Sequence, residues 1–222
     1  QGGETLTFTK DTDSGIVEYV GDGGSTPYTS LNYGNTYYRL KINSASGNNS
    51  YSPSSAVTVS NLTEVQSGTI SLENIAANGG LTQSGGTING TTNKTITGDF
   101  LQTGGTLSMP TGILTVTGNF DASGGTFGSQ ANPVSLKLTG TNKTFSDDPF
   151  YGDVTISGSI TATSDLDLNS LTVELGAYLN MDGYKLTVAG NVINDGDIPN
   201  ASSITIGGDL TNSGSVFSHA GN

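Results

Sequence analysis

A glycine-rich segment recurs along this chain about every 19 residues. Its clearest copies begin at Gly79, Gly98 and Gly118, and each continues through an apolar residue and a short polar run to the tripeptide Gly-Gly-Thr. Weaker copies begin at Gly190 and Gly208. A fixed period of this length is typical of stacked repeats, in which each unit packs only against its neighbours. The repeat therefore predicts one continuous body and not several separate globular domains.

Within the repeats, apolar residues stand two positions apart. This spacing places their side chains on one face of a β-strand. Clear pairs are Leu40 and Ile42, Val57 and Val59, Leu114 and Val116, Leu136 and Leu138, and Leu186 and Val188. A repeat of about 19 residues has room for three strands of roughly 4 to 5 residues with turns between them. We therefore predict an all-β fold: a single-stranded parallel β-helix, or β-solenoid, right-handed, with three short strands per coil.

An antiparallel sandwich is the competing interpretation, because short strands with turn signals also suit that fold. The Gly-Gly, Asn-Gly and Asp-Gly pairs between the strands supply the positive φ angles of tight turns in either case. A sandwich gives no reason for the same turn residues to return at a constant interval. The constant interval favours the solenoid.

A longer period contains the shorter one. The order of motifs in residues 1–131 begins again in residues 132–222, with an offset of roughly 110 residues. We expect one continuous β-solenoid domain over 1–222, with a first super-repeat (1–131, including a tyrosine-rich loop region) and a partial second one (132–222). Neither end shows a polar capping segment. We therefore expect a longer repeat array, or copies of the chain that stack end to end into a filament.

The charge balance limits the partners. The chain has 7 basic and 19 acidic residues, a formal net charge of -12, so phosphate backbones and anionic membrane surfaces would repel it. We expect no nucleic acid partner and no direct membrane insertion, since no apolar run approaches the roughly 18 residues that a membrane span needs.

The chain has no cysteine, which excludes disulfides and thiolate chemistry. Its 33 glycines, with abundant serine and threonine, are typical of extracellular β-rich proteins.

The residues needed for polysaccharide cleavage are sparse. Asp147 and Asp148 resemble one part of a hydrolase site, but the single histidine, His219, lies close to the end of the sequence and Arg39 is the only arginine. A lyase would also need a strong base and a cation beside the abstracted proton. We therefore expect a non-catalytic protein without cofactors.

Three pairs of aspartates stand two residues apart. Carboxylate oxygens are the ligands that calcium prefers, but each pair offers too few of them, and turn chemistry explains such pairs equally well. We predict no metal site. The pairs are Asp11 and Asp13, Asp165 and Asp167, and Asp195 and Asp197.

Aromatic residues gather in one short segment and at the equivalent place in the second super-repeat. Exposed rings can stack on the faces of sugars, so these residues are the candidate glycan contacts. The competing interpretation is that they anchor a long loop against the wall of the solenoid. The residues are Tyr28, Tyr33, Tyr37, Tyr38, Phe150 and Tyr151.

Two neighbouring repeats carry threonine at alternate positions, Thr95 with Thr97 and Thr115 with Thr117. Flat threonine arrays on solenoids can bind ice, but they need this pattern on most coils. Ice binding is therefore a minor hypothesis.

Three segments carry a family resemblance: Gly-Ile-Val-Glu-Tyr at 15–19, Tyr-Arg-Leu-Lys-Ile at 38–42, and Leu-Thr-Val-Ala-Gly-Asn-Val-Ile-Asn at 186–194. The chain resembles the low-complexity β-solenoid modules of long bacterial surface proteins and adhesins. This resemblance implies an extracellular or cell-surface location and carries over no catalytic residue. We expect a structural or adhesive protein, a rigid stalk, fibre subunit or surface module, whose partners are its own copies and surface glycans. The alternative is a carbohydrate-binding or carbohydrate-cleaving β-helix protein.

Overall fold

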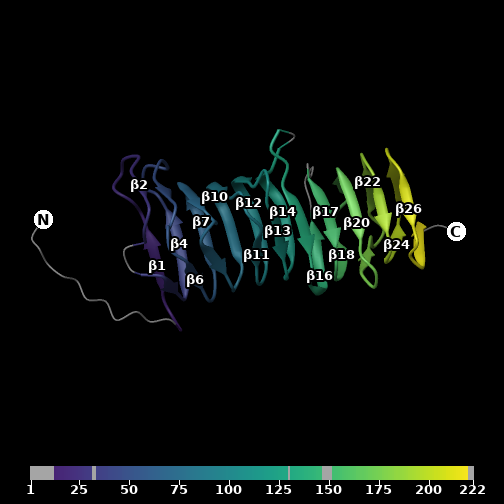
Figure 1. Ribbon diagram of the computed structural model, residues 1–222, viewed down its shortest axis with the longest axis horizontal. Coiled ribbons are helices and arrows are strands. Elements are labelled where there is room, and N and C mark those ends of the chain that lie inside the picture. Colours follow the sequence, from purple (N-terminus) through teal and green to yellow (C-terminus); the bar gives the residue numbers. More distant parts are fainter. Residues whose placement is uncertain (1–12, 32–33, 130, 147–151, 220–222) are drawn as a thin grey trace, which may run out of the picture.

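The computed structural model describes residues 13–31, 34–129, 131–146 and 152–219. Within these ranges the chain forms 27 β-strands and no helix, and neighbouring strands pair in parallel. The strands stack along one axis, so the sequence runs from one end of the body to the other (Figure 1). The predicted all-β parallel solenoid is confirmed. The antiparallel sandwich is wrong, because each coil hydrogen-bonds to the next with the same strand direction.

The largest sheet has fourteen strands. Eleven of them succeed one another along the axis: β1 (Ile16–Tyr19), β4 (Arg39–Asn43), β7 (Thr63–Ser67), β10 (Leu81–Asn89), β12 (Phe100–Ser108), β14 (Phe120–Phe127), β16 (Thr141–Ser146), β18 (Ser159–Ala162), β21 (Tyr178–Asn180), β24 (Asp197–Ala201) and β27 (Val216–His219). Three short strands form a branch of this sheet that joins β10: β2 (Pro27–Tyr28), β5 (Ser50–Tyr51) and β8 (Thr69–Ser71). We call it the long sheet.

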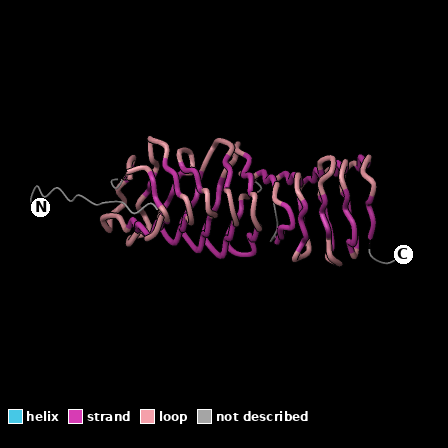
Figure 2. Tube along the Cα trace, turned by 90° about the horizontal axis from the view of Figure 1, so that it is seen from below, coloured by secondary structure: helices cyan, strands magenta, loops and turns pink. Residues whose placement is uncertain are grey.

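A second sheet has ten strands, one from each coil. It consists of β3 (Thr36–Tyr37), β6 (Val57–Val59), β9 (Ile75–Ala77), β11 (Lys94–Ile96), β13 (Ile113–Val116), β15 (Ser135–Leu138), β17 (Asp153–Ile156), β20 (Ser170–Val173), β23 (Val192–Asn194) and β26 (Leu210–Asn212). A third sheet holds β19 (Leu166–Leu168), β22 (Lys185–Val188) and β25 (Ser203–Ile206). Figure 2 shows these strands as successive turns of one winding chain.

The strand register gives the length of a coil. Leu81 lies opposite Phe100 and Phe100 opposite Phe120, so the central coils take 19 and 20 residues. The first two coils are longer, since Ile16 lies opposite Arg39 and Leu40 opposite Thr63, which is 23 residues in each case. The additional residues form loops at the N-terminal end, beside the tyrosine-rich segment.

The Gly-Gly pairs lie inside long strands and not in separate tight turns. The first part of β10 pairs with β7 and its last part with β8, and the register shifts between them, so Gly85 and Gly86 mark a corner that the strand turns without a break. A side chain at Gly85 would place its Cβ 2.3 Å from the carbonyl oxygen of Gln66 in the coil before. Glycine is therefore needed here because backbones of successive coils approach closely.

The inward-facing residues form one core along the axis. In its middle, the rings of Phe100 and Phe120 stack with centroids 5.0 Å apart, and Phe127 packs edge-on against both. Phe145 of the next coil continues the column at 5.6 Å from Phe120. Repeated aromatic contacts of this kind bury large apolar areas and hold neighbouring coils in register.

Two glutamines are enclosed in this core. Gln83 and Gln102 have no exposed surface, and Gln102 donates a hydrogen bond from its side-chain amide to Gln83 Oε1 at 3.0 Å. Each amide also donates to a backbone carbonyl of the next coil, Gln83 to Thr106 and Gln102 to Thr126. These bonds satisfy the amide nitrogens and Gln83 Oε1, whereas Gln102 Oε1 is buried without a hydrogen-bond partner.

Candidate functional site

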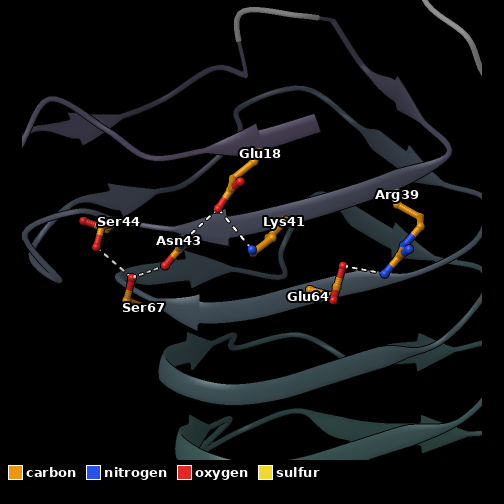
Figure 3. A network of polar contacts seen from close by, with 7 residues as sticks. All are labelled: Glu18, Arg39, Lys41, Asn43, Ser44, Glu64 and Ser67. Atoms are coloured by element: carbon orange, nitrogen blue, oxygen red, sulfur yellow. Dashed lines mark hydrogen bonds and ion pairs between the residues drawn. The ribbon is translucent and has the colours of Figure 1, made fainter. Parts of the chain in front are cut away.

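A group of charged side chains lies on the outer face of the long sheet, over β1, β4 and β7 (Figure 3). Glu18, Lys41 and Glu64 stand opposite one another in register on these three strands. Lys41 Nζ lies 3.1 Å from Glu18 Oε1, and Arg39 lies 2.9 Å from Glu64 Oε2. Opposite charges on neighbouring strands stabilise a sheet modestly.

Polar residues extend this group toward the end of β4. Asn43 donates a hydrogen bond to Glu18 Oε1 at 2.7 Å and accepts one from Ser67 at 3.2 Å. The Ser67 hydroxyl also lies 2.7 Å from the carbonyl oxygen of Ser44 (Figure 3). The network thus links three successive coils through their outward side chains.

Two carboxylates of this network, Glu18 and Glu64, are the place to look for a hydrolase-type pair of carboxyl groups. Glu18 and Glu64 lie two strands apart on the same face, so their backbones are separated by roughly 9.5 Å. Such a hydrolase needs one carboxyl group that keeps its proton near neutral pH. Here the hydrogen bonds from Asn43 and Lys41 lower the pKa of Glu18. Lys41 and Asn43 thus favour the charged form of Glu18, and Arg39 forms an ion pair with Glu64.

A buried asparagine joins the long loops of the first two coils. Asn49 has no exposed surface; its amide donates to Asp22 Oδ1 at 2.8 Å, and its Oδ1 accepts the Ser44 hydroxyl at 2.7 Å. Asp22 also accepts hydrogen bonds from Thr26 and from the backbone of Gly24. Bonds from Thr26, Asn49 and Gly24 lower the pKa of Asp22 to about 2. This carboxylate therefore orders the loop.

The candidate glycan residues occupy different environments. Tyr37 is 2 % exposed and belongs to the core, so its ring faces are not open to a sugar. Tyr28 is half-buried and stacks on Tyr51 at 5.2 Å, and Tyr38 is half-buried and accepts a hydrogen bond from Asn61 at 3.0 Å. For these three residues the placement favours the anchoring interpretation. Tyr33, Phe150 and Tyr151 lie outside the described residues.

Two of the aspartates considered as calcium ligands accept hydrogen bonds from the following coil. Asp165 accepts the backbone N–H of Lys185 at 2.9 Å, and Asp195 accepts the hydroxyl of Ser213. Asp167 lies opposite Thr187 in the three-stranded sheet. Among the residues that the structure describes, no three His, Asp or Glu side chains gather as a metal site would require. Asp11, Asp147 and Asp148 fall outside those residues.

The outward threonines of the ten-stranded sheet form an interrupted column. Thr95 lies opposite Thr115, as the repeat suggests, but the next positions are Lys137 and then Thr155. Lys137 forms an ion pair with Glu174 at 2.7 Å across this face. A charged bridge breaks the regular hydroxyl array that ice binding would need.

Sequence reasoning missed the acceptors that connect one coil to the next. Asp99 Oδ1 accepts the backbone N–H of Asn119 at 2.7 Å, Asn119 Oδ1 accepts that of Thr144 at 3.1 Å, and Asn191 Oδ1 accepts that of Asp209 at 2.8 Å. The signal was present, because an Asp or Asn follows glycine in most copies of the repeat. A Cβ at Gly118 would lie 2.3 Å from Asp99 Oδ1 and equally close to the backbone carbonyl carbon of Gly98, and the backbone contact explains the glycine.

Glu73 is the most heavily bonded of these acceptors. It receives the hydroxyls of Thr91 and Thr92 at 2.9 and 2.6 Å, together with both of their backbone N–H groups. These bonds, with Lys94 nearby, lower the pKa of Glu73 to about 2. The carboxylate thereby fixes the turn of the following coil before β11.

Acid is expected to loosen this turn. The pKa of Glu73 falls from 4.5 to about 2 in the folded chain, so its stabilising effect is complete above about pH 4.5 and is lost as the pH falls toward 2. We expect Glu73→Gln to lower the free energy of unfolding at neutral pH. Between about pH 4.5 and 2, the free energy of unfolding of the variant should fall less steeply than that of the wild type. Urea unfolding at a series of pH values measures both effects. Parallel pH profiles for the variant and the wild type would contradict the assignment.

Together the fold and these contacts define the class of protein: a β-solenoid in which several outward polar side chains connect one coil to the next. Searches of protein-family models, curated proteins and solved structures find no match to this chain. The described part contains no helix that is both long and apolar enough to span a membrane.

Proposed function

We propose that this chain is a non-catalytic structural module of an extracellular or cell-surface protein, acting as a rigid stalk, a fibre subunit or a presenting surface. The observation that carries the proposal is the continuous use of side chains as links between coils. Asp99, Asn119 and Asn191 each hold the backbone of the following coil, and Glu73 holds the next turn. Residues used in this way resist bending of the stack and are not free to act on a substrate.

The titration of the carboxyl groups supports a non-catalytic role. The hydrogen bonds at Glu18, Asp22, Glu73 and Glu174 all lower the pKa of the carboxyl group concerned. A general acid or base works best with a pKa near the operating pH, which for a carboxyl group requires an upward shift. These carboxyl groups are adapted to accept hydrogen bonds.

The geometry also suits a spacer. Parallel strands rise about 4.8 Å per coil, so ten coils extend roughly 50 Å. The -12 net charge opposes non-specific association of such rods and their binding to anionic surfaces. Asparagine, serine and threonine at the outward positions keep the surface polar without many charges.

Three measurements test the proposal. Small-angle X-ray scattering of the isolated chain should give an elongated particle of roughly the length expected from ten coils, and incubation with soluble polysaccharides should release no reducing ends. Antibody labelling of intact cells of the source organism should mark their surface. Release of reducing ends that Glu18→Gln abolishes would establish an enzyme instead, and labelling that requires permeabilised cells would overturn the location.

A further inference from the structure

Four tyrosines of the first two coils form a connected series of ring contacts. Tyr19 packs edge-on against Tyr37 and Tyr51, with ring centroids 6.3 and 6.0 Å apart, and Tyr28 stacks on Tyr51. One of these contacts also joins two hydroxyl groups: the oxygens of Tyr19 and Tyr37 lie 2.8 Å apart. Because the Tyr37 hydroxyl donates its hydrogen to the carbonyl oxygen of Gly34, Tyr19 is the donor between the two phenols.

This arrangement suits the oxidative coupling of two phenols. Removal of a hydrogen atom from tyrosine leaves an unpaired electron that is shared by the oxygen and the two ring carbons beside the hydroxyl-bearing carbon. Two such rings couple through those carbons, and the product carries its hydroxyl groups side by side. Tyr19 and Tyr37 already hold their hydroxyls in that relation, with the ring planes 75° apart.

Burial favours this pair further. Tyr37 is 2 % exposed and tied to Gly34, so its ring cannot turn away, whereas Tyr19 is only half-buried and remains accessible to an oxidant. The chain contains no cysteine and no tryptophan, the side chains that would otherwise be oxidised first. Its two methionines, Met109 and Met181, are buried in the core of later coils.

We propose that Tyr19 and Tyr37 form a dityrosine cross-linking site, with hydrogen peroxide and a peroxidase-type catalyst as the oxidant. Each phenol gives up one hydrogen atom, a carbon–carbon bond forms between the two rings, and the ring hydrogens at the joined carbons move to the oxygens. The peroxide takes up the two hydrogen atoms removed and becomes two molecules of water. The proposal concerns a chemical modification and does not depend on the structural role proposed above.

The cross-link would join two faces of the first coil. Tyr19 ends β1 in the long sheet, and Tyr37 lies in β3 of the ten-stranded sheet. A bond between them closes a loop that must otherwise be ordered on folding, so it lowers the conformational entropy of the unfolded chain. The N-terminal coil would then melt at a higher temperature than in the unmodified chain.

The test is peroxidase and hydrogen peroxide treatment of the dilute, folded chain, followed by mass spectrometry and peptide mapping. We expect a monomer that has lost the mass of two hydrogen atoms, dityrosine fluorescence, and a peptide pair joined through Tyr19 and Tyr37. Tyr19→Phe, which keeps the ring and leaves the Tyr37–Gly34 bond in place, should abolish this product. Tyr178→Phe, at a tyrosine 38 % exposed in β21, is the matched control and should leave it unchanged.

Other products would overturn the assignment. Coupling that occurs only between chains, through exposed residues such as Tyr178 and Tyr184, would show that the buried contact does not react. A cross-link that maps to Tyr28 and Tyr51 would assign the site to the stacked pair instead. An equal yield of the Tyr19–Tyr37 product in denaturant would show that the folded contact contributes nothing.

Discussion

Gly105→Ala is expected to destabilise the chain by about 2–5 kcal/mol, from the left-handed backbone and the forced overpacking together. Gly105 has a φ of +78°, and a Cβ there would lie 2.5 Å from the carbonyl oxygen of Gly86 in the preceding coil. The nearest atoms are all backbone atoms of Gly85 and Gly86, so the coil itself must move. Urea unfolding followed by circular dichroism measures the loss.

Gly183→Ala is the matched control for this prediction. Gly183 also has a positive φ, +87°, but a Cβ there has open space around it. Its substitution should cost only the left-handed backbone preference, about 1–2 kcal/mol. Equal losses for the two variants would show that contact between coils does not set the requirement for glycine at Gly105.

Phe120→Ala is expected to cost about 3–5 kcal/mol, the range for removing a large aromatic side chain from a packed core. The Phe120 ring has no exposed surface and contacts Phe100, Phe127 and Phe145, so its loss leaves a cavity in the middle of the aromatic column. Urea unfolding should register the whole effect. Hydrogen exchange should rise first in β12 and β14.

Phe120→Leu separates ring stacking from simple burial. Leucine refills part of the space but restores no aromatic contact, so its cost should fall between those of the wild type and the alanine variant. If the leucine variant is as unstable as the alanine variant, its loss of stability comes from strain in the repacked core and not from a cavity. A nearly neutral alanine variant would contradict the role of the column altogether.

The acidity of the chain has a structural explanation in several places. Asp22, Glu73 and Asp99 accept backbone or hydroxyl hydrogens from a neighbouring turn or coil, and a carboxylate accepts such bonds strongly. A solenoid exposes many backbone donors at its corners. Acidic and amide side chains satisfy these donors without the bulk of another strand.

The repeat predicted the fold because its signal is local. Alternating apolar residues such as Leu114 and Val116 specify an inward and an outward face, and their return at a constant interval requires stacked coils. The Gly-Gly pairs were understood only in part. The sequence predicted that glycine is needed at these positions. It did not predict that each pair lies inside a single bent strand, because that depends on contacts with the preceding coil, which are not visible in the local sequence.

One tetrapeptide occurs twice in the chain and adopts a different structural position each time, so its sequence alone does not predict that position. Thr-Asn-Lys-Thr occurs at 92–95 and again at 141–144. The first copy leads into β11 of the ten-stranded sheet, where Asn93 accepts the backbone N–H of Ile113 at 3.0 Å. The second lies in β16 of the long sheet, where Asn142 has a φ of +54° at a shift in register. The neighbouring coils, and not the four residues, decide between these positions.

The aromatic segment shows the same limit for the candidate site. The tyrosines were found from their clustering, but their spacing could not tell a core ring from a surface ring. Tyr37, at the end of β3, is buried, whereas Tyr38, in the bend between β3 and β4, is half-buried. The contact of Tyr37 with Tyr19 crosses the interior between two sheets, so no pairing rule along a single strand could have predicted it.

The sequence by itself determined the all-β solenoid, the length of its coil and the acidic, polar character of its surface, because each follows from a periodic choice of residue type. Only the tertiary structure decided which acceptor holds which coil, where the strand turns its corner, and which tyrosines meet. Those contacts join residues about one coil apart in the chain, and they exist only when the coils are stacked in one particular register.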